Sequence, residues 1–183
     1  MKWMTHKAVA LAGALAVQAP PVALVAVLVG SVLPDMIDTA LARGNRQVWR
    51  RIHRQSSHWF GWYVLLIAAG FALPSQEDLL PLLILMQKGF PGLSSNALMQ
   101  VEQCGADLVV WTGIGGLSHI LLDALTPMRV PIYPFGGRQR FGIKLVSTGT
   151  WKESVFLVCA VGIIALQFYQ ARTVFNQAIQ HFW

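Results

Sequence analysis

Residues 115–127 read GGLSHILLDALTP, and this stretch places a histidine and a carboxylate inside an apolar run. His119 and Asp123 are four residues apart, so on a helix their side chains leave the same face about one turn apart. Burying Asp123 without a cation or strong hydrogen-bond donors is more costly than such a helix can offset. The pair therefore predicts two metal ligands, with a structural hydrogen-bonded pair as the alternative.

The composition of the chain is that of a membrane protein. Of its 183 residues, 55% are hydrophobic and 12% are charged, whereas soluble domains have roughly 25% charged residues. This favours a membrane protein over a soluble domain with a large core. Two cysteines in dissimilar surroundings, Cys104 and Cys159, indicate neither a disulfide framework nor a cysteine-rich zinc site.

The apolar segments predict an all-α, polytopic membrane protein. Residues 8–33 lack charge but contain Pro20-Pro21, which favours one helix ending near Gln18 and another beginning at Pro21. We therefore expect an N-terminal helical hairpin. About three further membrane-spanning helices, completing a helical bundle, are expected from the apolar segments at residues 59–74, 108–125 and 155–169.

We expect a single membrane-embedded domain over residues 1–183. Its parts are a core at 5–135, a basic cytoplasmic loop at 136–152, and a C-terminal membrane helix and tail at 153–183. Residues 79–86 are apolar but too short to cross a bilayer alone, so a re-entrant or interfacial segment is expected there. Residues 87–105 and 131–150 are rich in turn formers and are predicted to be loops.

The basic residues predict the orientation of the chain. With the N-terminal hairpin, twelve of the fourteen lysines and arginines fall on one side and two, Lys88 and Arg172, on the other. Such an excess is typical of the cytoplasmic side. The formal net charge of +6 is thereby explained without a specific nucleic-acid partner. The twelve residues are Lys2, Lys7, Arg43, Arg46, Arg50, Arg51, Arg54, Arg129, Arg138, Arg140, Lys144 and Lys152.

Four polar clusters fall on this predicted cytoplasmic side. They lie at residues 5–6, 34–38, 53–58 and at the His119/Asp123 pair. The fifth histidine, His181, falls in the tail on the opposite side. Nitrogen and carboxylate ligands that converge at one membrane face suit zinc, manganese or iron, and zinc is the usual choice for hydrolysis.

Each cluster also has a simpler interpretation. His6 fits an interfacial histidine, and Asp35 after Pro34 fits a helix cap. His53 and His58 stand among arginines and fit a basic patch that faces anionic lipid. The case for a metal site rests on the four clusters together.

These clusters resemble the successive motifs of a known family. Residues 5–6 (TH), 30–35 (GSVLPD), 53–58 (HRQSSH) and 118–127 (SHILLDALTP) are similar to the motifs of the YdjM-type metal-dependent hydrolases. That family is described as inner membrane-associated and LexA-binding, and it is distantly similar to zinc-dependent phospholipase C and P1-type nucleases. The resemblance implies a multi-pass protein of the bacterial inner (cytoplasmic) membrane, with its N-terminus and polar site on the cytoplasmic side, that hydrolyses a phosphoester.

The chain departs from the family pattern at three positions. Gln55 and Ser57 stand where glycine and threonine are more usual, and Asp38 follows Asp35 by three residues instead of two. Whether Asp38 is a ligand is therefore left open.

The leading hypothesis is a membrane-embedded hydrolase that holds one or two divalent ions and acts on a phosphoester such as a phospholipid head group. Its ligands are predicted to be His6, Asp35, His58, His119 and Asp123.

Other residues of the clusters are given supporting roles in this hypothesis. His53 is expected to protonate the leaving group or to support a ligand. Arg54, with Arg51, is expected to neutralise the phosphate. Ser57 and Ser118 are expected to orient ligands.

The rival hypothesis is a membrane adaptor or assembly subunit without enzymatic activity, in which arginine closes the cluster. Its signature would be Arg54 paired with Asp123 or Asp35, together with ligand atoms more than ~4 Å apart and too distant for one metal. Membrane lipid is the expected partner in either hypothesis, and a homo-oligomer or a membrane-protein partner is left open. Nucleic-acid hydrolysis gains little support, and transport is disfavoured because the polar residues gather at one face.

Overall fold

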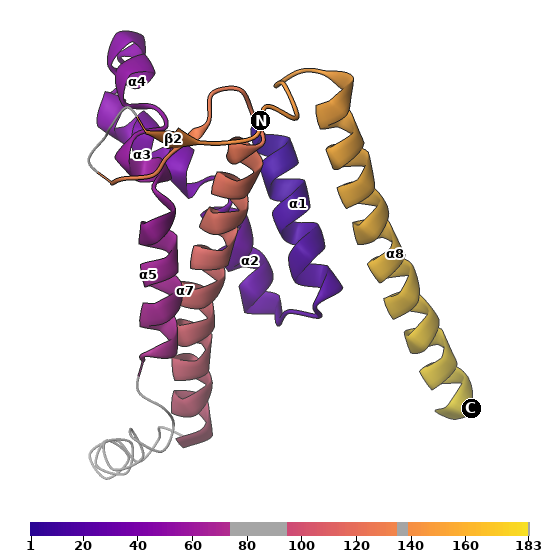
Figure 1. Ribbon diagram of the computed structural model, residues 1–183. Coiled ribbons are helices and arrows are strands. Elements are labelled where there is room, and N and C mark those ends of the chain that lie inside the picture. Colours follow the sequence, from indigo (N-terminus) through magenta and orange to yellow (C-terminus); the bar gives the residue numbers. More distant parts are fainter. Residues whose placement is uncertain (74–94, 135–138, 183) are drawn as a thin grey trace.

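A computed structural model describes residues 1–73, 95–134 and 139–182, and this part of the chain is mostly helical. In chain order the elements are α1 (Trp3–Ala16), α2 (Pro21–Gly30), α3 (Leu33–Ala42), α4 (Arg46–Ile52), the 3-10 helix η1 (Ser56–His58), α5 (Phe60–Phe71), α7 (Ser95–Ala124), β1 (Val130–Pro131), β2 (Arg140–Phe141) and α8 (Trp151–Phe182). Figure 1 shows α1, α2, α5 and α7 side by side, with α8 diverging from them towards the C-terminus.

Within the described residues, two helices are long and apolar enough to cross a membrane. They are Gln103–Ala124 within α7 and Trp151–Ala171 within α8. Helices α2 and α3 give a third span if the pair, bent by 45°, is counted as one. Helix α5 is apolar but has only 12 residues, and the apolar segment 79–86 lies outside the described residues. The predicted helical membrane protein is confirmed at this level, whereas the hairpin and the span count stay predictions.

The N-terminal break lies at the proline pair. Helix α1 ends at Ala16 and α2 begins at Pro21, where a proline at the first helical position costs little.

Glycines of α7 bring this helix against both of its neighbours. A β-carbon on Gly115 would lie 2.3 Å from the carbonyl oxygen of Val27 on α2. A β-carbon on Gly116 would lie 2.0 Å from the ring of Tyr63 on α5. Only glycine, which has no β-carbon, allows these approaches. The C-terminal end of α7 is thereby held between α2 and α5.

Two of the predicted loops are partly wrong. Residues 95–105 belong to α7, because alanine, leucine, methionine and glutamine in this stretch favour a helix more than Gly105 opposes it. The remainder of that predicted loop, residues 87–94, lies outside the described residues. In the second loop, β1 and β2 form an antiparallel pair that aligns Val130 with Phe141 and Pro131 with Arg140.

Candidate metal centre

The polar site lies at the end of the bundle where the N-terminus, α3, η1 and the C-terminal end of α7 meet (Figure 1). His6, His58 and His119 are each 0% exposed, Asp123 is 1% exposed and Asp35 is 7% exposed. All five predicted ligands are thus buried in one region of the molecule. The five residues come from α1, α3, η1 and α7, so only the folded bundle assembles the site.

Four donor atoms form a closed ring in which nitrogen and oxygen alternate. Asp35 Oδ1 lies 3.4 Å from His58 Nε2 and 3.8 Å from His119 Nε2. On the other side, Asp123 Oδ2 lies 3.7 Å from His58 Nε2 and 3.5 Å from His119 Nε2. Bonds of ~2.0–2.2 Å to a tetrahedral zinc ion place neighbouring ligand atoms ~3.3–3.6 Å apart. The four edges of the ring are therefore close to the separations between neighbouring ligands of one ion, although the wider grouping of donor atoms divides its residues between two sets, Asp35 and His58 in one and His119 and Asp123 in the other.

Three atoms of this ring are buried and have no hydrogen-bond partner within the part of the chain that the structure describes. They are Asp35 Oδ1, His58 Nε2 and His119 Nε2. Buried polar atoms are nearly always paired, so three orphaned acceptors or donors facing one another call for an explanation. A divalent cation among them is the group that would satisfy all three at once.

The remaining atom of each ligand is held by a neighbour. Ser57 Oγ lies 3.0 Å from His58 Nδ1, and His119 Nδ1 lies 2.7 Å from the carbonyl oxygen of Ser31. A carbonyl can only accept, so His119 carries a proton on Nδ1, and its Nε2 faces the ring. Such outer contacts fix the tautomer and orientation of metal-binding histidines.

The two carboxylates are held in the same way. Trp3 Nε1 donates to Asp35 Oδ2 at 2.7 Å, and Arg54 Nη2 donates to Asp123 Oδ1 at 2.8 Å. Each carboxylate therefore has one oxygen fixed by a donor and the other directed into the ring.

His58 is also in the protonation state that a metal ligand needs. It lies in η1, and burial lowers the pKa of its imidazole below the usual value, which favours the neutral ring. Neutral imidazole is the form that binds metals.

His6 is a fifth donor beside the ring. Its imidazole stacks on that of His119, with centroids 3.9 Å apart, and its Nε2 lies 3.5 Å from Asp123 Oδ1. Both ring nitrogens of His6 are buried without a hydrogen-bond partner. Donor atoms of His6, His119 and Asp123 lie within 4.8 Å of one another, so these residues can also hold an ion as a group.

Asp38 connects the site to the arginine-rich segment. Its Oδ1 accepts from Ser57 Oγ at 2.5 Å, and its Oδ2 lies 3.0 Å from His53 Nδ1 and 3.2 Å from the backbone nitrogen of Arg54. Its donor atoms also group with those of Asp35, His53 and His58. Both oxygens of Asp38 are thus engaged by donors at residues 53–57.

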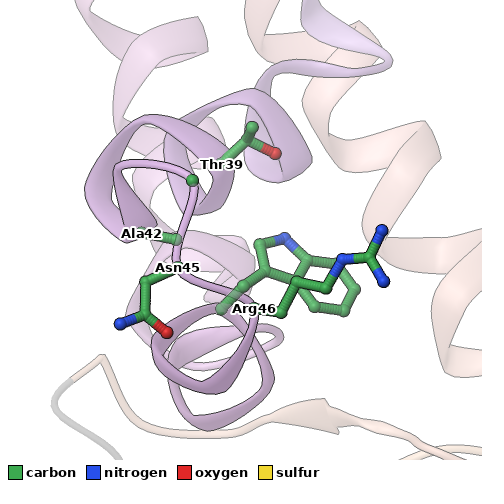
Figure 2. Close-up of a pocket in the computed structure, with 6 residues that line it drawn as sticks. Thr39, Ala42, Asn45 and Arg46 are labelled. Carbon is green, nitrogen blue, oxygen red and sulfur yellow. The ribbon is translucent and has the colours of Figure 1, made fainter.

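His53 lies at the rim of the site. Its side chain is 12% exposed, and its ring stacks on Trp49 of α4 with centroids 4.0 Å apart. Beyond Trp49 lies a pocket of about 200 Å³ between α3 and α4, lined by Thr39, Asn45 and Arg46 among others (Figure 2). His53 is thus the site histidine most accessible from outside.

Arg54 is buried and adopts a left-handed backbone conformation, with φ of 59°. Besides Asp123, its guanidinium donates to Thr126 Oγ1 at 2.6 Å, and the amino group of Met1 donates to the same Asp123 oxygen at 3.0 Å. The arginine pairing expected of a structural network is therefore present. It occupies the outer oxygen of Asp123 and leaves the ring of donor atoms open.

Several residues that support the site were not identified from the sequence. Glu153 at the start of α8 accepts hydrogen bonds from Thr5 Oγ1, from the backbone nitrogen of Lys2 and from the backbone nitrogen of Gly149. Its sequence signal is similar to that of Asp123: each is a lone carboxylate within an apolar helix, which needs hydrogen-bond donors if it is buried. Trp3, by contrast, gives no sequence signal that distinguishes it from an interfacial tryptophan.

Comparison with known proteins agrees with this placement in a membrane. The chain matches the family model described as YdjM inner membrane protein over residues 1–180. No curated protein and no solved structure gives a match. The distant similarity to phospholipase C and P1 nuclease therefore stays a prediction. The match covers nearly the whole chain, which belongs to the YdjM inner membrane protein family.

Proposed function

We propose that the protein is a membrane-embedded, metal-dependent hydrolase of phosphoesters. The observation that carries the proposal is the ring of Asp35, His58, His119 and Asp123 donor atoms, with orphaned atoms on three of them. A purely structural core of this size would not leave three buried polar atoms unpaired.

The residues present fit a divalent ion, with zinc expected first and manganese or iron as alternatives. Asp35, His58, His119 and Asp123 would hold it, and His6 would complete its shell or share a second ion with His119 and Asp123. Bound there, the metal supplies Lewis acidity and an activated water. The outer contacts from Ser57, the Ser31 carbonyl, Trp3 and Arg54 keep the donor atoms directed inward.

In this proposal His53 and Arg54 contact the substrate directly. His53 is at the accessible rim and has Nδ1 fixed by Asp38, so its ring is held in place to give a proton to the leaving oxygen. Two nitrogens of Arg54 hold Asp123 and Thr126, while its Nε is buried without a partner. This Nε is the donor left for an oxygen of the phosphate.

A second candidate is a membrane adaptor or assembly subunit that has no enzymatic activity. The contact between Arg54 Nη2 and Asp123 Oδ1 at 2.8 Å favours it, because a buried ion pair of this kind can serve the fold alone. It leaves the orphaned atoms of Asp35, His58 and His119 without an explanation.

Hydrolysis by the detergent-purified protein tests the proposal. We expect bis(p-nitrophenyl) phosphate or p-nitrophenyl phosphate to be cleaved when zinc or manganese is added, and p-nitrophenyl butyrate, a carboxyl ester, to be left intact. His58→Ala is expected to abolish cleavage, whereas His181→Ala, which removes the histidine outside the predicted site, is expected to retain it. Metal-loaded protein that cleaves neither phosphoester would overturn the enzymatic proposal and favour the adaptor.

A further inference from the structure

An apolar pocket opens directly beside the metal centre. It has a volume of about 340 Å³ and lies between α3, η1 and α5. Leu33 and Ile37 of α3 form one wall, and Tyr63 and Leu66 of α5 form the other. Leu33 and Ile37 are four residues apart, so they present one face of α3 to the pocket. The volume is at the lower end of that found for small-molecule sites.

The pocket and the metal centre share Ser57. This residue lines the pocket, and its hydroxyl contacts both Asp38 Oδ1 and His58 Nδ1. Its carbonyl oxygen accepts a hydrogen bond of 2.9 Å from the hydroxyl of Tyr63. A molecule in the pocket therefore contacts Ser57, the residue before the predicted metal ligand His58. The hydrogen bond from Tyr63 holds the wall between the pocket and the metal centre in place.

The chemistry of the walls selects an apolar occupant. Among the described residues that line the pocket there is no charged side chain; the polar ones are Ser56, Ser57 and Tyr63, whose hydroxyl is bonded to the Ser57 carbonyl. The surface around it is apolar as well, since Ile37 is 37% exposed, Trp62 is 43% exposed and the neighbouring Leu65 is 55% exposed. Such a surface on an apolar helix of a membrane protein faces hydrocarbon.

We propose that this pocket binds a hydrocarbon chain of a phosphoester lipid while the head group of that lipid reaches the metal centre. The inference rests on the proposed function and narrows its substrates to amphipathic phosphoesters, because a chain in the pocket positions its phosphate near His58 and Asp35. Binding energy from the chain then orients the scissile bond, which is the usual role of a remote substrate contact.

Photolabelling tests the pocket without depending on hydrolysis. The full-length protein is placed in phosphatidylcholine nanodiscs that contain phosphatidylglycerol with a diazirine on one acyl chain, and adducts are mapped by mass spectrometry. We expect adducts to concentrate on the segments that carry Ile37 and Leu66. Leu66→Trp and Ile37→Trp, which fill the pocket from opposite walls, are each expected to lower labelling there at least about five-fold. The matched control Leu65→Trp adds the same ring on the outer face of α5 and should not change labelling.

Chain-length dependence links the pocket to turnover. For a long-chain and a short-chain phosphodiester that share a head group, Leu66→Trp should lower the ratio of kcat/KM (long over short) at least about ten-fold, since lost burial of two methylene groups gives that factor. Leu65→Trp should leave the ratio unchanged.

The two failures are distinguishable. Adducts spread evenly over the exposed face of α8, or labelling that neither pocket variant reduces, would overturn the pocket even if phosphoesters are hydrolysed. Labelling confined to the pocket in a protein that hydrolyses nothing would retain the lipid site and overturn the proposed function.

Discussion

Replacing Gly116 with alanine is expected to disturb both the fold and the metal centre. The added β-carbon would lie 2.0 Å from Cδ1 and 2.3 Å from Cε1 of Tyr63, far inside van der Waals contact. Tyr63 is 2% exposed and its hydroxyl is bonded to the Ser57 carbonyl, so the ring cannot move without pulling on the residue next to His58. The displacement of the Tyr63 ring is therefore transmitted towards the predicted ligand His58 through the hydrogen bond from Tyr63 to Ser57.

The size of this effect follows from opposing contributions. Overpacking costs about 1–3 kcal/mol, and loss of the Tyr63 hydrogen bond adds about 1 kcal/mol. The better helix propensity of alanine returns about 1 kcal/mol. Gly116→Ala should thus lower the free energy of unfolding by about 1–3 kcal/mol.

Gly105→Ala is the matched control on the same helix. A β-carbon on Gly105 would meet no atom within 4 Å, so this variant should gain up to about 1 kcal/mol. Unfolding by sodium dodecyl sulfate in dodecyl maltoside micelles, followed by far-UV circular dichroism, measures both variants. The expected difference between them is about 1–4 kcal/mol. A difference below about 0.5 kcal/mol would refute the packing of α7 on α5 at Tyr63.

The same unfolding assay tests two buried carboxylates, and metal titration tests a third. Arg54→Met should lower the free energy of unfolding of the metal-free protein by about 3–5 kcal/mol, because it removes a cation that pairs with the buried Asp123 carboxylate. A decrease below about 1 kcal/mol would contradict a buried ion pair. Glu153→Gln should lower the free energy of unfolding by about 1–3 kcal/mol, because it weakens three hydrogen bonds. The exposed neighbour variant Lys152→Gln should leave that free energy unchanged. Equal effects of the two variants would contradict a stabilising role of the Glu153 hydrogen bonds. Asp38→Asn should weaken zinc affinity about 10–100-fold in competition with a chromophoric chelator, and unchanged affinity would exclude a positioning role.

The sequence was sufficient to predict a helical membrane protein and to name the five ligand candidates. The structure places all five in one buried region. The i, i+4 spacing of His119 and Asp123 survives in the structure because a helix is a rigid local frame. Asp35 was the more ambiguous residue, since an aspartate after a proline also fits a helix cap. In the structure its side chain instead accepts a hydrogen bond from the Trp3 indole. These residues are far apart in the chain, so no local sequence pattern predicts the contact.

Other features that the sequence did not predict depend on contacts between residues far apart in the chain. Arg54 reaches Asp123 at the end of α7 and Thr126 just after that helix, and only the assembled bundle determines which oxygen of Asp123 it takes. The sequence offered metal binding and arginine pairing as alternatives, but the two oxygens of one carboxylate allow both. The helix at residues 95–105 was missed because Gly89, Pro91, Gly92 and the run Ser94-Ser95-Asn96 indicate a loop, and the predicted loop extends to Gly105.

Metal content tests the central claim most directly. Wild-type protein, His119→Ala and His181→Ala are purified in detergent without chelator and analysed by inductively coupled plasma mass spectrometry. The wild-type protein and His181→Ala should hold one or two equivalents of zinc, manganese or iron, and His119→Ala should hold much less, because it removes an orphaned nitrogen of the ring. Equally low metal in wild-type protein and His119→Ala, persisting after zinc and manganese are added and excess is removed, would show that the ring of donor atoms is not a metal site.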